Sequence, residues 1–205
     1  MHFTLMDLVT DIAQNGIESG ADVVELELRE TLNASGGEFR FTVKDNGKGM
    51  TAAELKLAQD PFVTDGVKHP GRKVGLGLPF LIQTSEQSGG GWKIDSEKRQ
   101  QAPSGTTDGT PQAAKASGTT VSAWFNLGNV DTPPVGDIPG MFRTSLLFEG
   151  PAEMVIKRFR QTPEGITDYE IRKTELVDAL GGIEDVQSII LLDRYLRSLE
   201  EHEGD

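Results

Sequence analysis

The chain has 205 residues, which is enough for one domain with a substantial hydrophobic core, or for one domain with an appendage. Its formal net charge of −12 and its pI of about 4.7 argue against generic binding to nucleic acid or to anionic membranes, because both are polyanions. The absence of cysteine excludes disulfides and thiolate metal sites, and the three histidines (His2, His69 and His202) are too scattered to suggest a zinc site.

The N-terminal segment lacks the basic start of a signal peptide and carries Asp7. No apolar run approaches the length of a membrane span. We therefore expect a cytoplasmic protein that does not insert into membranes.

The pattern predicts an opening helix over residues 2–19, which stops at Gly20. One face is apolar, and the opposite face carries acidic and amide side chains at helical spacing. A solvated surface is the simpler interpretation of the polar face, and a ligand-binding face is the alternative. The apolar positions are Leu5, Leu8, Val9, Ile12 and Gly16, and the polar positions are Asp7, Asp11, Asn15 and Glu18.

A β-hairpin follows, because apolar residues alternate over 24–28 and again over 39–43, with the turn-forming segment NASGG between them. The second strand ends at Asp45 in the segment DNGKG. Glycine lets the backbone approach a flat ligand closely, so Asp45 with Gly47 and Gly49 could hold a carboxylate against a planar group such as a purine amine. An ordinary turn is the competing interpretation.

Thr51 and Glu54 form a capping box, which predicts a short helix ending near residue 59. Residues 60–74 contain prolines, glycines and the densest basic cluster of the chain, and we expect a long mobile loop there. Pro79 suits the first turn of a following helix, so Gly75 and Gly77 lie where free backbone N–H groups favour phosphate. The glycine spacing does not match the dinucleotide fingerprint, and the sequence contains no P-loop.

Strands are predicted at 92–96 and 119–127, and the polar, aromatic-free segment 97–117 between them is predicted to be disordered. Residues 128–141 are predicted to be a connector. Strand-like pieces follow at 145–148 and 154–159, and then helices near 168–180 and 183–201. The last helix carries an apolar stripe, interpreted first as core and second as a partner surface: Val186, Ile189, Ile190, Leu196 and Leu199.

The order of these motifs resembles the GHKL ATPase superfamily, which comprises gyrase-type topoisomerases, heat-shock chaperones of the ninety-kilodalton class, histidine kinases and mismatch-repair ATPases. LVTDIAQNGIESGAD resembles its asparagine motif, VKDNGKGM its adenine motif, DPFVTDG and VGLGLPF its lid and second glycine motif, and SGTTVSAWF its closing strand. The histidine kinase branch is the most similar. The resemblance implies an α+β fold, a two-layer α/β sandwich of the Bergerat type, with helices on one face of a mixed sheet.

The same resemblance implies the roles of individual residues in binding ATP and Mg²⁺. Asp45 would accept the adenine amino group, Asn15 would bind the metal, and Asp11 would be the catalytic base. The remaining nucleotide contacts would come from Gly47, Gly49, Lys68, Arg72, Lys73, Gly75, Leu76, Gly77 and either Thr119 or Thr120.

The sequence departs from the family in three places. Asp11 stands where the hydrolysing branches have glutamate, and a misplacement of about 1 Å can lower a rate roughly a hundredfold. The chain has no helical hairpin with a phosphoacceptor histidine. The strand that usually precedes the asparagine helix is also missing, so we expect a strand from 145–159 to occupy that edge of the sheet.

We therefore expect residues 1–141 to form a histidine kinase-like ATP-binding domain with a flexible insertion at 97–117. Residues 142–205 would extend that domain or form a partner-binding module. The expected activity is slow Mg²⁺-dependent ATP hydrolysis, or protein phosphorylation in trans of the anti-sigma type in signal transduction, with lid closure coupled to a protein partner through the C-terminal helices. A nucleotide-gated regulatory module that does not hydrolyse ATP is the alternative, and a homodimer is compatible with either.

Overall fold

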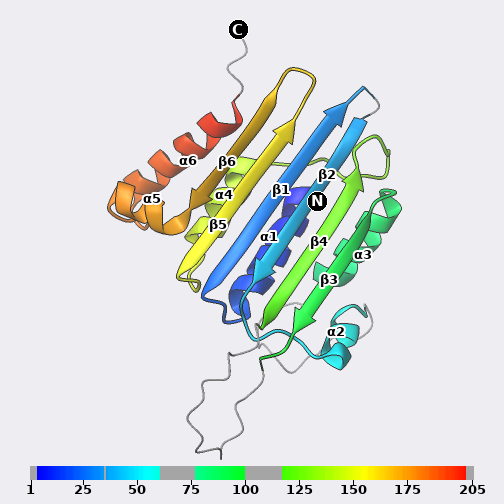
Figure 1. Cartoon of the computed structure of the whole chain (residues 1–205). Coiled ribbons are helices and arrows are strands. Elements are labelled where there is room, and N and C mark those ends of the chain that lie inside the picture. The colour runs from blue at the N-terminus through cyan, green and yellow to red at the C-terminus, as the bar shows by residue number, and fades with distance from the viewer. Residues whose placement is uncertain (1–3, 35, 61–76, 100–116, 202–205) are drawn as a thin grey trace, which may run out of the picture.

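The computed structural model describes residues 4–34, 36–60, 77–99 and 117–201, in which a six-stranded sheet is packed against helices (Figure 1). Its strands are β1 (Val23–Asn33), β2 (Gly36–Asp45), β3 (Gly91–Glu97), β4 (Gly118–Asn126), β5 (Glu153–Gln161) and β6 (Ile166–Arg172). Its helices are α1 (Leu5–Glu18), α2 (Ala52–Ala58), α3 (Gly77–Gln87), α4 (Ile138–Leu147), α5 (Lys173–Leu180) and α6 (Val186–Glu200).

The strand order is β3-β4-β2-β1-β5-β6, and β1 pairs with β5 in parallel while the other neighbours pair antiparallel. The sheet is therefore mixed. Helices α1, α3 and α4 lie behind it in the view of Figure 1. This arrangement confirms the predicted α+β two-layer sandwich.

The core forms between the helices and one face of the sheet, because alternate strand residues point to opposite faces. Leu26 on β1 and Phe41 on β2 are fully buried on this face, as are Leu8 on α1 and Phe142 on α4. All five apolar positions predicted for the opening helix are buried. The predicted hairpin is confirmed, with β1 and β2 in antiparallel register from Val24↔Asp45 to Asn33↔Gly36.

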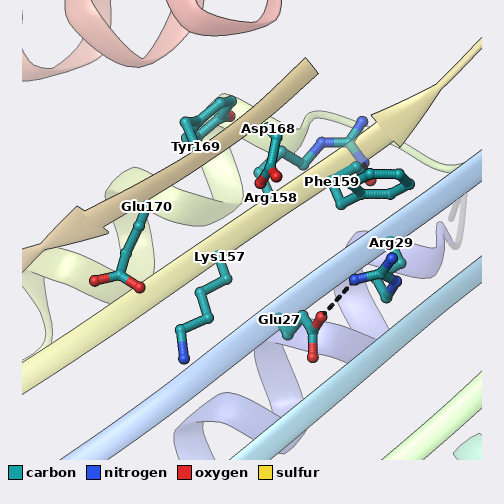
Figure 2. Close-up of a pocket in the computed structure, with 8 residues that line it drawn as sticks. All are labelled: Glu27, Arg29, Lys157, Arg158, Phe159, Asp168, Tyr169 and Glu170. Atoms are coloured by element: carbon teal, nitrogen blue, oxygen red, sulfur yellow. Dashed lines mark hydrogen bonds and ion pairs between the residues drawn. The ribbon is translucent and has the colours of Figure 1, made fainter. Parts of the chain in front are cut away.

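The other face of the sheet is polar and is held by ion pairs. Glu25 binds both Lys44 and Lys157, at 3.4 and 3.2 Å, and the Arg29 guanidinium lies 4.3 Å from the centre of the Phe159 ring. A depression of about 220 Å³ lies on this face over β1, β5 and β6, and Figure 2 shows the residues that line it, among which Glu27 pairs with Arg29. These contacts are typical of a sheet face that is exposed to solvent.

The predicted start of α2 is confirmed, whereas α1 begins at Leu5 and not at residue 2. Thr4 caps α1 and Thr51 caps α2, each through a capping box with an acidic residue three positions later. Helix α1 ends at Glu18 with Ser19 as its C-cap, and Gly20 follows with a φ of 76°, as expected for a glycine that stops a helix.

Two predictions for the C-terminal part were wrong, and a third was right only in part. Residues 145–148 are not a strand, because 138–147 form α4, which is capped by Asp137 and buries Phe142 and Leu146 one turn apart. Residues 168–172 are not helical and belong to β6. The predicted core stripe of α6 is right only in part: Leu196 is buried and Leu199 packs against the core, whereas Val186 and Ile190 are 72% and 47% exposed.

A strand from the C-terminal part does lie beside β1, as predicted. It is β5, whose parallel register with β1 runs from Val23↔Glu153 to Thr31↔Gln161. β5 separates β1 from the edge strand β6. The first strand of the N-terminal segment is therefore an interior strand of the complete sheet.

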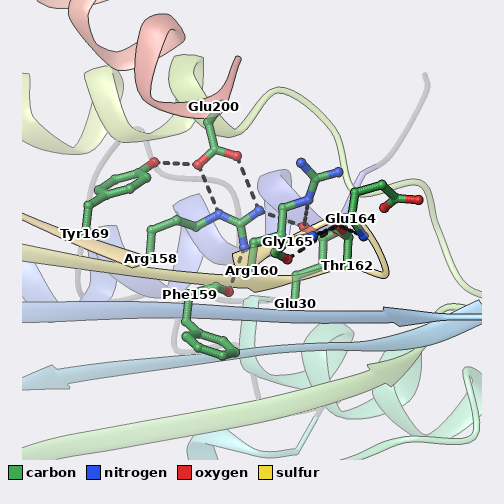
Figure 3. A network of polar contacts seen from close by, with 9 residues as sticks. All are labelled: Glu30, Arg158, Phe159, Arg160, Thr162, Glu164, Gly165, Tyr169 and Glu200. Atoms are coloured by element: carbon green, nitrogen blue, oxygen red, sulfur yellow. Dashed lines mark hydrogen bonds and ion pairs between the residues drawn. The ribbon is translucent and has the colours of Figure 1, made fainter. Parts of the chain in front are cut away.

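A buried ionic network fastens α6 to the sheet (Figure 3). Arg158 of β5 is 1% exposed, and its guanidinium donates to Glu30 of β1 at 2.6 Å and to Glu200 of α6 at 3.0 Å. The Tyr169 hydroxyl of β6 also donates to Glu200. Burial and the nearby Glu200 carboxylate raise the pKa of Tyr169. Elements from both ends of the chain therefore share one polar cluster.

Candidate functional site

The turn that follows β2 places a carboxyl group inside the protein. Asp45 is 8% exposed, and its Oδ1 accepts hydrogen bonds from the Gly47 amide at 2.8 Å and from the Ser19 hydroxyl at 3.0 Å. Burial raises the pKa of Asp45, and the hydrogen bonds from Gly47, Ser19 and the Thr119 backbone oppose that rise. The carboxylate is thus held in a fixed orientation at the end of a strand.

The glycines of this turn are required by close backbone packing. Gly49 has a φ of 61°, and a Cβ there would lie 1.9 Å from the carbonyl oxygen of Glu97. A Cβ on Gly47 would lie 1.8 Å from the Ser19 hydroxyl oxygen. Gly118, at the start of β4, has a φ of 140° and would place a Cβ 2.0 Å from the Asp45 carbonyl oxygen. The turn is therefore compact before any ligand binds.

The two threonines predicted to complete the base pocket lie on opposite faces of the sheet. Thr119 is the register partner of Asp45 and of Ser96, and its hydroxyl is 2.9 Å from the Ser96 hydroxyl. Thr120 pairs with Lys44 and Asp95, which are exposed on the polar face. Because side chains alternate along a strand, Thr119 shares the face of Asp45 and Thr120 does not.

Helix α1 carries the second half of the candidate site. Asp11 and Asn15 are exposed on it, one turn apart. The N-terminus of α3 faces them, because a Cβ built on Gly77 would lie 3.5 Å from Asp11 Cβ and 3.6 Å from Asn15 Nδ2. The first residue of a helix carries free backbone N–H groups that favour an anion, so the polar face of α1 meets a position suited to phosphate.

The two halves of the site adjoin each other through α1. Gly16 follows Asn15, and a Cβ on Gly16 would lie 3.6 Å from Asp45 Cβ. The structure therefore brings together Asp11, Asn15, Asp45, Gly47, Gly49, Gly77 and Thr119. The expected residues Lys68, Arg72, Lys73, Gly75 and Leu76, together with most of the predicted loop 60–74 and insertion 97–117, lie outside the described residues.

The donor set suits a purine nucleotide with Mg²⁺. A carboxylate can accept the exocyclic amine of a purine, a helix start can bind phosphate, and a single amide oxygen with phosphate oxygens and waters satisfies Mg²⁺. Among the described residues, no group of three or more histidine, aspartate or glutamate side chains is arranged to hold a metal ion. None of the helices in this part of the chain is long and apolar enough to cross a bilayer.

Sequence reasoning missed several residues that shape the site. Ser19 contacts Asp45 although the two are 26 positions apart, and Asn46 Oδ1 accepts from the amides of Asp22 and Val23 at 2.9 and 3.0 Å. Ser96 accepts from the amide of Met50 at 2.8 Å. These contacts cross between elements, so local sequence patterns do not show them. Gly118 had a visible signal, because it precedes the two threonines of the closing strand.

Comparisons with known proteins connect this arrangement to one family and several relatives. The family model described as "Histidine kinase-, DNA gyrase B-, and HSP90-like ATPase" matches residues 3–129. The DNA mismatch repair protein MutL of Thermus aquaticus is 30% identical over 102 residues, which are 50% of this chain and 18% of that protein. The MutL protein of Gemmatimonas aurantiaca is 28% identical over 130 residues, covering 56% of this chain and 20% of that protein. The chain thus spans about a fifth of the length of these curated relatives.

Two solved structures are also similar. A mycobacterial sensor histidine kinase, MprB, aligns with a TM-score of 0.37 and 19% identity over 58% of this chain and 68% of that one. The ATP-binding domain of topoisomerase IV from Francisella tularensis, in complex with a small-molecule inhibitor, aligns with a TM-score of 0.40 and 15% identity over 82% of this chain and 84% of that one.

Proposed function

Because the chain belongs to the family of histidine kinase-, DNA gyrase B-, and HSP90-like ATPases, we propose that it binds ATP and Mg²⁺ between α1, the turn after β2 and the start of α3. We further propose that it hydrolyses ATP slowly or transfers phosphate to another protein in trans, as anti-sigma kinases do.

The observation that supports ATP binding best is the buried Asp45 carboxylate at the end of β2, with Oδ1 fixed by Gly47 and Ser19. A hydrogen bond from a purine amine to this carboxylate would be charge-assisted and worth roughly 1.5 to 3 kcal/mol. Guanine carries a carbonyl oxygen where adenine carries the amine. A fixed acceptor at this position therefore favours adenine.

Asn15 and the start of α3 would hold the metal and the phosphate tail. When bound, Mg²⁺ would neutralise phosphate charge and orient the terminal phosphoryl group. Asp11 lies on the same helix face, one turn before Asn15, next to Gly77. From there its carboxylate would orient and deprotonate an attacking water or protein hydroxyl.

Direct binding measurements test the proposal. With Mg²⁺ present, we expect ATP and ADP to raise the melting temperature and GTP to have little effect, because a ligand that binds only the folded state stabilises it. Asp45→Ala should abolish the adenine contact and weaken ATP at least tenfold with or without metal. Asn15→Ala should remove the Mg²⁺ dependence of binding instead.

Two variants control for nonspecific damage. Gln14→Ala removes a neighbouring amide of α1 that binds Glu18, and Asp95→Ala removes an exposed strand aspartate on the polar face. Both should bind ATP normally. Equal losses in the Asp45 and Asn15 variants under all metal conditions would contradict the proposed division of roles.

A nucleotide-gated module that does not hydrolyse ATP is the second candidate, and the shorter side chain at Asp11 favours it. ADP formation by purified protein separates the two functions. An ATPase should release ADP in a Mg²⁺-dependent manner and lose this activity in Asp11→Ala while keeping ATP affinity. Tight ATP binding with no ADP release, in the wild-type protein as in the variant, would support the module.

We also propose that a protein partner binds at α5 and α6 and responds to lid closure. The support for this surface is its apolar character: Val186, Ile190, Leu191 and Tyr195 of α6 are exposed, and a groove of about 490 Å³ lies between the two helices. Its lining includes Leu176 and Leu180 of α5. Exposed apolar patches of this kind are typical of interaction sites.

A further inference from the structure

Ser19 lies at the end of α1 and reaches across to the end of β2. Its hydroxyl oxygen is 3.0 Å from Asp45 Oδ1 and 2.7 Å from the carbonyl oxygen of Gly16. The backbone amide of Ser19 bonds to the same Gly16 carbonyl at 3.2 Å, so α1 is terminated by its backbone. The hydroxyl has a single hydrogen, which lies between the Gly16 carbonyl and Asp45 Oδ1, and because the Gly16 carbonyl also accepts from the backbone, that hydrogen can be donated to Asp45.

The protein already supplies three donors to the Asp45 carboxylate. They are the Ser19 hydroxyl, the Gly47 amide and the Thr119 backbone amide. A carboxylate offers about four lone-pair sites. Three of these lone-pair sites face protein donors, so about one remains for a donor on a ligand. The direction of this remaining lone pair depends on the three hydrogen bonds that hold the carboxylate.

Ser19 also determines which residue can stand at position 47. A Cβ there would lie 1.8 Å from the Ser19 hydroxyl oxygen and 2.6 Å from Ser19 Cβ. The serine side chain thus fills the space beside the turn and keeps Asp45 and the Gly47 amide in one compact unit. The hydroxyl of Ser19 contacts the carboxylate that, under the proposed function, recognises adenine.

We infer that Ser19 is a positioning residue for adenine recognition, which fixes the Asp45 carboxylate so that its remaining acceptor points at the purine amine. The inference rests on the proposed ATP-binding function. It adds to that function a residue at the end of α1, the helix that carries Asn15. The side chain of this residue, Ser19, would orient the Asp45 carboxylate.

The expected effect of Ser19→Ala is a loss of about tenfold in ATP affinity, since a hydrogen bond to a charged group is removed. The matched control is Ser88→Ala. Ser88 is fully buried, and its hydroxyl donates to the Ser85 carbonyl at 2.7 Å, the same three-residue bond at the end of a different helix. This control should bind ATP within about twofold of the wild-type protein.

The pH dependence of ATP affinity tests this role, because a purely structural role of Ser19 would leave that dependence unchanged. The pKa of Asp45 is raised by burial and lowered by Gly47, Ser19 and Thr119, and no charged side chain of the described residues is among these causes. Removing the Ser19 donor should therefore raise the pKa further. The pH below which ATP affinity falls should be higher in Ser19→Ala, and carbon NMR of the Asp45 carboxyl should show the same shift without nucleotide.

The outcomes separate this inference from the proposed function. Wild-type affinity and an unchanged pH profile in Ser19→Ala would overturn the role of Ser19 and leave ATP binding intact. Equal losses in the Ser19 and Ser88 variants would overturn it as well, because the effect would then be general. Failure of the wild-type protein to bind ATP would overturn both. If Ser19→Ala does not fold, Ser19→Cys keeps a side chain of similar shape with a weak donor and should bind with intermediate affinity.

Discussion

The Asp45 carboxyl group illustrates a conflict between stability and recognition at the scale of a single residue. Burial raises its pKa, which means that the ionised form, which would accept a purine amine under the proposed function, is disfavoured in the folded protein. A group whose pKa is higher in the folded state contributes stability below its unfolded pKa. That contribution is lost as pH rises through the folded-state value.

Asp45→Asn should therefore stabilise the ligand-free protein at neutral pH. The amide oxygen can still accept from Gly47 and Ser19, and it carries no charge to desolvate. We expect a melting temperature a few degrees above that of the wild-type protein at pH 7, and a difference that shrinks as pH falls toward the usual range of aspartate. Thermal denaturation across this pH range measures it.

The same variant should lose ATP-induced stabilisation, because an amide in place of the carboxylate no longer makes the charge-assisted bond. Asp95→Asn, on the exposed polar face, should change neither property. A neutral-pH melting temperature below that of the wild-type protein would show that ionised Asp45 contributes net stability through its three hydrogen bonds.

At the scale of elements, the attachment of α6 depends on the buried Arg158. Arg158→Ala would leave the carboxylates of Glu30 and Glu200 without their buried partner, and breaking such a pair typically destabilises a protein by about 3 to 5 kcal/mol. We expect a loss of that size in urea denaturation.

Arg197→Ala on the same helix is the matched control for Arg158. Arg197 is 46% exposed and binds Asp193 at 2.9 Å, one turn earlier on α6. Exposed pairs contribute about 0 to 1 kcal/mol, so this variant should remain close to wild type. Similar losses in the two variants would argue against a special role for the buried network.

Local sequence patterns determine some of these helices and strands but not others. Helix α1 and the β1–β2 hairpin were predictable because their apolar periodicity and their stop signals agree. The segment around Leu146 was not, because a short apolar run is compatible with strand or helix, and the Asp137 cap with the buried Phe142 and Leu146 decided for the helix.

In the candidate site, the residues of α1 and of the turn after β2 were found from motifs, whereas Ser19 was not. Its contact with Asp45 joins two elements that are 26 positions apart, and its hydroxyl follows no periodic pattern. The face of each threonine also required the register of β4, since Thr119 and Thr120 are equivalent in sequence and opposite in the sheet.

At the scale of the whole molecule, the C-terminal part completes the sheet that carries the site. β5 pairs with β1 from Val23 to Thr31, and Phe142, Leu192 and Leu196 contribute to the core. We therefore expect deletion of residues 142–205 to unfold the remainder, which circular dichroism and size-exclusion chromatography would detect. A truncated protein that folds and binds ATP would instead identify the C-terminal part as an independent partner module.

The parallel pairing of β1 with β5 also has a consequence for synthesis. The ion pair between Glu30 and Arg158 joins residues 128 positions apart, so β1 is synthesised long before β5, the parallel strand with which it pairs. Pairings of such long sequence separation form slowly. Nascent chains halted before β5 emerges should remain protease-sensitive, and the proposed nucleotide site should form only after β5 and α6 have left the exit tunnel.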